Sequence, residues 1–77
     1  MEGSITKKYR ISEEEAENNI NEIQNKAFRE CFEELQRELN EELEMGYTFS
    51  FRFNTDWYGV GENEIIYTKT LKYMCLK

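Results

Sequence analysis

The chain has 77 residues and a mass of 9.3 kDa, so it is expected to form one small domain around a thin core. Its 16 acidic and 10 basic residues give a net charge of −6, and it contains neither histidine nor proline. This composition excludes a collagen-like chain, a disulfide scaffold and a membrane-spanning chain. The five Phe, five Tyr and one Trp argue against disorder.

The first residues, 1–4, lack the basic start and apolar run of a signal peptide. No stretch approaches the roughly 18 apolar residues that a membrane helix needs. We therefore expect a cytoplasmic location and no membrane contact. Cys31 and Cys75 each fall within an apolar pattern, and we expect both to be free, buried thiols.

Residues 3–11 alternate in side-chain type, which predicts a strand. Ser12 and Glu15 then form a capping box, which marks the start of a helix. The helix is predicted over 12–45, because this segment is rich in good helix formers and Gly46 is a suitable stop.

Residues 47–76 are predicted to form a hairpin. The first strand of this hairpin has the clearest alternation of apolar and polar side chains in the chain, with aromatic residues at every second position from Tyr47 to Phe53. A loop is expected over 55–63. In the last strand, Lys69 interrupts a series of apolar residues at alternate positions. It marks either a bulge or a position at the sheet margin where its aliphatic stem packs and its amine stays in water.

The element order is therefore βαββ in a single domain, 1–77, of the α+β class. We expect two layers, with one long helix packed on a three-stranded, mostly antiparallel sheet. The pattern leaves the strand order open. A helix of this length spans about 50 Å and a strand of eight residues about 26 Å, which predicts that the helix outruns the sheet.

The helix carries two apolar stripes, turned from one another by roughly 120°. The bulky stripe is expected to face the sheet, and it consists of Phe28, Phe32, Leu35, Leu39 and Leu43. The smaller stripe is predicted to be a self-association seam, with a homodimer favoured, and it includes Ala16, Ile20, Ile23 and Ala27. The alternative is that the helix bends at its Asn-rich region and folds the smaller stripe into the core.

Charge is segregated, because residues 12–45 carry a net −9 and the rest of the chain +3. The acidic helix face is either a solvated surface or a docking surface for another protein. As protein-binding residues we predict Glu30, Glu33, Glu34, Glu41 and Glu44, with Trp57 and Tyr58 as anchors. The alternative prediction for Trp57 and Tyr58 is that both lie in the core.

The sheet face away from the helix is predicted to be rich in hydroxyl groups and cations. It is either an ordinary solvent face or a site for a phosphorylated nucleotide, whose phosphates would meet Lys8, Arg10, Arg52 and Lys72. Direct binding of long nucleic acid is not expected, because the overall charge is negative.

The sequence contains no recognisable set of catalytic residues. Histidine is absent and Asp56 is the single aspartate, so no catalytic residue, cofactor or metal site is predicted. In size, acidity and lack of catalytic residues the chain resembles small phage-encoded anti-defence proteins, including the anti-CRISPR inhibitors.

This resemblance implies a non-catalytic inhibitor that occupies a surface of another protein, such as a nucleic-acid-handling defence nuclease. It covers composition and no motif, so it assigns no functional residue. The alternatives are an oligomeric binder that sequesters a nucleotide signal, and a structural or assembly subunit.

Overall fold

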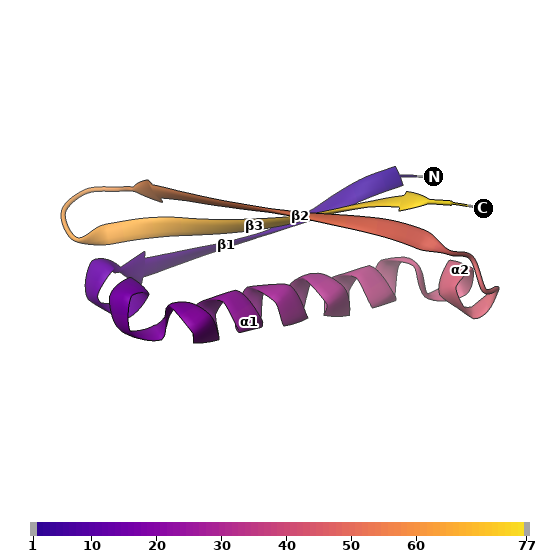
Figure 1. Cartoon of the computed structure of the whole chain (residues 1–77), viewed down its shortest axis with the longest axis horizontal. Coiled ribbons are helices and arrows are strands. Elements are labelled where there is room, and N and C mark those ends of the chain that lie inside the picture. The colour runs from indigo at the N-terminus through magenta and orange to yellow at the C-terminus, as the bar shows by residue number, and fades with distance from the viewer. Residues whose placement is uncertain (1, 77) are drawn as a thin grey trace.

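The computed structural model describes residues 2–76 and has two layers, one of helix and one of sheet (Figure 1). Along the chain the elements are β1 (Glu2–Ser12), α1 (Glu13–Glu38), α2 (Asn40–Glu44), β2 (Phe49–Gly59) and β3 (Glu64–Cys75). The predicted α+β class, the βαββ order and the long helix on a three-stranded sheet are confirmed.

The last strand in the chain lies in the centre of the sheet, in the order β1-β3-β2. Both neighbours of β3 run antiparallel to it, and each register continues without a skipped residue. Lys69 therefore marks no bulge. Lys69 lies on the same face of the strand as Tyr67 and Leu71. Its ammonium group donates to Thr55 Oγ1 at 3.3 Å and lies 5.5 Å from the centre of the Phe53 ring.

The predicted capping box begins the helix, since Ser12 Oγ accepts a hydrogen bond from the main-chain N–H of Glu15 at 3.0 Å. The turn between β2 and β3 adds a second contact, in which Asn63 O accepts from Glu13 N at 2.9 Å. The helix predicted over 12–45 is divided at Leu39, and α1 has a kink at Asn19.

The expectation that the helix outruns the sheet is wrong, because the strands are longer than the sequence pattern indicated. The 26 residues of α1 span about 39 Å, and the 11 residues of β1 or β2 span about 36 Å. β2 continues through residues 55–59, which were predicted to be loop. Figure 1 shows α1 running beside the sheet along its length, with both chain ends and α2 at one end of the molecule.

The core lies between α1 and the strands β1 and β3. Its centre is on β3, where Tyr67 and Leu71 are fully buried. One core cluster consists of Ile5, Cys31, Leu35, Leu39, Phe49 and Leu71. The other consists of Ile11, Ile23, Ala27 and Tyr67. Cys31 and Cys75 are both free thiols, the first buried and the second half-buried.

The two helix stripes share the contact with the sheet that was predicted for the bulky stripe alone. The small stripe faces the sheet, where Cys31 Sγ lies 4.0 Å from the main-chain oxygen of Lys69. Small residues let the helix approach the central strand closely, and Phe28 lies beside this contact with its ring stacked on Phe53. Leu35 and Leu39 are buried as predicted, whereas Phe28 is 45% exposed and Leu43 is 39% exposed.

Candidate functional site

The predicted self-association seam is largely inside the protomer. Ile23 and Ala27 are buried against Ile11 and Tyr67, so these two side chains are not available to a second chain. Ala16 and Ile20 are half-buried, and they line a depression of about 490 Å³ beside Trp57. The alternative interpretation, in which this stripe belongs to the core, is therefore the one that the structure supports.

Two of the predicted protein-binding carboxylates instead hold α1 over β1. Glu34 Oε1 lies 2.9 Å from Lys7 Nζ, and Glu30 accepts a hydrogen bond from the hydroxyl of Tyr9. The bond to Glu34 raises the pKa of Lys7, and burial together with the bond to Glu30 raises the pKa of Tyr9. Glu30 and Glu34 are thus internal contacts between helix and strand.

The other three carboxylates of that prediction are exposed. Glu33 lies 3.8 Å from Arg29 on the next turn of α1, and Glu44 accepts from the side-chain amide of Asn40 at 3.4 Å. Glu41 and Glu44 belong to α2, at the end of the molecule opposite the turn between β2 and β3 (Figure 1). The acidic residues therefore do not form one continuous surface with Trp57.

The two predicted anchors lie on opposite faces of the sheet, because consecutive residues of a strand alternate. The ring of Trp57 packs edge-on against Tyr67 at 4.6 Å on the helix side. Tyr58 pairs with Ile66 on the other side. Both residues are exposed, at 37% for Trp57 and 47% for Tyr58, and each belongs to a different surface.

The four predicted anion-binding cations share the sheet face away from the helix, which we call the open face, but they separate into two places. Arg10 is engaged by Glu64, with Nε 2.7 Å and Nη2 3.1 Å from its carboxylate oxygens, and this contact lowers the pKa of Glu64. Lys8 is opposite Thr68. Two cations remain together, Lys72 and its cross-strand neighbour Arg52.

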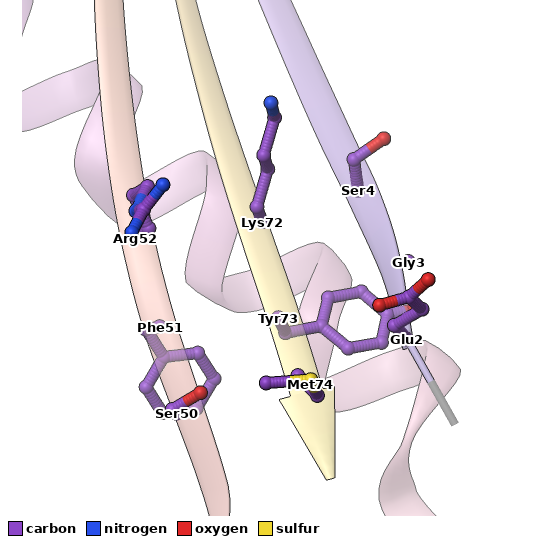
Figure 2. Close-up of a pocket in the computed structure, with 9 residues that line it drawn as sticks. All are labelled: Glu2, Gly3, Ser4, Ser50, Phe51, Arg52, Lys72, Tyr73 and Met74. Atoms are coloured by element: carbon purple, nitrogen blue, oxygen red, sulfur yellow. The ribbon is translucent and has the colours of Figure 1, made fainter.

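Figure 2 shows Ser4, Lys72 and Arg52 on three adjacent strands, with the helix behind them. These residues line a depression with a volume of about 760 Å³ at the end of the sheet that holds the chain termini. Gly3, also at this depression, lets Tyr73 cross β1, because a Cβ at that position would lie 2.4 Å from the Tyr73 hydroxyl.

An exposed surface that the sequence did not predict lies along β2, on its helix side. We call it the aromatic flank, and it consists of Phe28, Phe32, Phe51, Phe53 and Trp57. Phe28 stacks on Phe53 with 4.7 Å between ring centres, and Phe32 meets Phe51 edge-on at 5.6 Å. Phe51 is 43% exposed.

The flank is exposed because α1 lies over β1 and β3 and leaves the inner side of β2 to these rings. The signal for it is present in the sequence, as Phe at alternating strand positions and Phe28 and Phe32 one helical turn apart. Its exposure depends on the lateral position of the helix, which the pattern alone does not give.

The outer edge of β2 adjoins this flank, and within the described residues 2–76 no strand pairs with it. Thr48 O accepts from Leu76 N at 2.8 Å, and Val60 N donates to Glu64 O at 2.9 Å, so even-numbered residues direct their main-chain groups toward β3. Because these directions alternate along an antiparallel strand, the odd-numbered residues from Phe49 to Gly59 direct theirs outward.

Comparison of the chain with protein-family models, with curated proteins and with solved structures gives no match. Among the residues that the structure describes, no group of three or more Cys, Asp or Glu side chains is arranged to hold a metal ion. Neither of the described helices combines the length and the apolar character needed to cross a membrane.

Proposed function

We propose that this chain is a non-catalytic protein-binding module that adds a strand of its partner to the outer edge of β2. The observation that carries the proposal is the coincidence of an unpaired strand edge, in the described chain, with the exposed aromatic flank beside it. In this mode of recognition the main-chain hydrogen bonds provide affinity and apolar contacts with alternate side chains provide selectivity.

Exposed aromatic rings support the proposal, because Phe, Tyr and Trp are enriched where proteins contact one another. Phe51 and Trp57 lie three positions to either side of the centre of a strand of 11 residues, on the same face, and both are more than a third exposed. An inhibitor that occupies a surface of another protein, such as a nucleic-acid-handling defence nuclease, is the form of this function that the chain's composition suggests.

A photoreactive phenylalanine analogue placed at Phe51 tests this function. The matched control carries the analogue at Glu14, an exposed position in the first turn of α1. After irradiation in cells, we expect protein adducts from position 51 and none above background from position 14. Equal labelling from both positions, or no adduct from position 51, would contradict binding at this flank.

A second candidate function is supported by the row of Ser4, Lys72 and Arg52 around the 760 Å³ depression. Two adjacent cations and a hydroxyl suit the phosphate of a nucleotide signal. Calorimetry with a panel of cyclic nucleotides tests it, with Lys72→Glu as the variant and Lys8→Glu as the control. Heat that is lost in the first variant and kept in the second would support a nucleotide site.

A further inference from the structure

Resting on the proposed function, we infer that the partner at the β2 edge is a second copy of this chain, paired antiparallel about a two-fold axis at Asn54. The strand runs from Phe49 to Gly59, so Asn54 is its central residue. A two-fold axis through the centre of an antiparallel pair makes every contact twice, as in isologous dimers.

The charges of β2 are self-complementary in this register. Arg52 and Asp56 lie two positions to either side of Asn54, on the open face, and both are exposed. Pairing about Asn54 places Arg52 directly opposite Asp56 of the second copy, and the symmetry repeats this ion pair. Directly opposite residues of an antiparallel pair have Cβ atoms about 4.5–5.5 Å apart, within reach for these side chains.

Neighbouring registers lose this complementarity. A two-fold axis at Phe53 or at Thr55 places both charged residues opposite neutral ones. An axis at Arg52 or at Asp56 places like charges opposite one another, which is unfavourable. A register centred between two residues would place an inward-facing residue of one copy opposite an open-face residue of the other. One copy would then be turned over, and its aromatic flank would lie on the open face of the other copy.

The same register joins the two aromatic flanks. Phe51 comes to lie opposite Trp57 of the second copy, and these are the two most exposed strand residues of the flank, at 43% and 37%. Aromatic pairs of this kind are favourable across strands. Both helices then cover the same face of a continuous six-stranded sheet, which removes the edge of β2 altogether.

Main-chain groups fit this arrangement as well. The six odd-numbered residues whose groups point outward are opposite one another in this register, since 49 pairs with 59, 51 with 57 and 53 with 55. They supply about 12 main-chain hydrogen bonds, close to the number in a typical protein interface. In the single chain, Trp57 N donates to Asp56 Oδ1 at 3.0 Å. In the dimer Trp57 N would donate to the second copy instead, which frees the Asp56 carboxylate for Arg52 of that copy.

A charge-exchange experiment tests the inference, with molecular mass followed against concentration by analytical ultracentrifugation. We expect the chain to sediment at twice its 9.3 kDa monomer mass. Arg52→Asp and Asp56→Arg, made singly, should each weaken the dimer at least about tenfold, because each places like charges opposite one another. The double variant restores the ion pair and should return the dissociation constant to within about threefold of the original.

Lys8→Asp, on the open face of the other edge strand, is the matched control and should leave the dimer unchanged. A monomer at submillimolar concentration, or a double variant no tighter than the single ones, would overturn the inference. The cross-linking experiment at Phe51 separates the two proposals: adducts with a different protein keep the proposed function and reject the second copy. Adducts at twice the chain's own mass support both.

Discussion

The two edge strands of the sheet present opposite surfaces to the surroundings. β1 lies under α1, and its inward-facing Lys7 is bound to Glu34 of the helix, with Lys8 and Arg10 on its open face. β2 lies to the side of α1, which contacts it through the rings of Phe28 and Phe32. Its inward side carries Phe51, Phe53 and Trp57, and its outer main-chain groups are unpaired in the described chain.

This difference bears on the strand addition proposed at β2. Charged residues that point inward on an edge strand, lysine above all, prevent further strands from adding to it. β1 has such a residue and a covering helix, so it is protected. β2 has no inward charge and is only partly covered by α1, and its aromatic side chains are the kind that an added strand would cover. The asymmetry therefore supports the binding proposed for β2, whereas β1 supports the helix.

The largest expected effect is a loss of stability on truncating a helix residue, and its size should differ between the side of α1 that faces the core and the side that faces the aromatic flank. Leu35→Ala removes a side chain buried against Ile5 and Leu71, and should lower the free energy of unfolding by about 3 kcal/mol. Phe28→Ala, on the aromatic flank, should lower it by about 1 kcal/mol, because the ring is already half exposed. Urea unfolding at concentrations that keep the chain monomeric measures both values, and equal losses would remove the distinction between the two sides.

The protection of β1 can be removed by Lys7→Met. Glu34 then loses its cation, and the free energy of unfolding should fall by less than for Leu35→Ala, because this ion pair is partly exposed. The β1 edge also loses its inward charge, so light scattering should increase with concentration more steeply than for the original chain. Lys8→Met, on the open face of the same strand, is the control. Identical scattering from both variants would show that Lys7 does not protect the edge.

The smallest effect concerns Tyr9, which joins β1 to Glu30 of the helix. Burial raises the pKa of Tyr9 above its ordinary value of 10.0, so folding favours the neutral phenol. The unfolded chain releases this proton first, and the free energy of unfolding should therefore decrease as the pH rises above 10.

Tyr9→Phe lacks this proton, so its loss of stability above pH 10 should be shallower. Near neutral pH the same change should cost less than about 1 kcal/mol, because one partly exposed hydrogen bond is removed. Unfolding curves of both proteins between pH 8 and about 11 measure the difference. Parallel pH profiles would show that Tyr9 carries no part of the alkaline dependence.

Much of the fold could be predicted from the sequence, because local signals determine it. The capping box at Ser12 begins the helix, and the alternation from Phe49 to Phe53 gives β2 its faces. The site was harder to predict. Glu30 and Glu34 were expected to face a partner, and they bind Tyr9 and Lys7 instead. Their roles depend on which strand lies beneath that side of the helix, and spacing along one helix does not carry this information.

The sequence by itself determined where the elements begin, which residues alternate on the strands and how charge divides between helix and sheet. These properties depend on hydrogen bonds and side-chain directions within a few residues of one another. Only the tertiary structure decided that β3 is central and that α1 lies over β1 and β3. The small residues Ala27 and Cys31 allow the helix to approach the central strand, and the larger Phe28 and Phe32 are left beside β2. The aromatic flank follows from that packing, because the sheet is wider than one helix can cover.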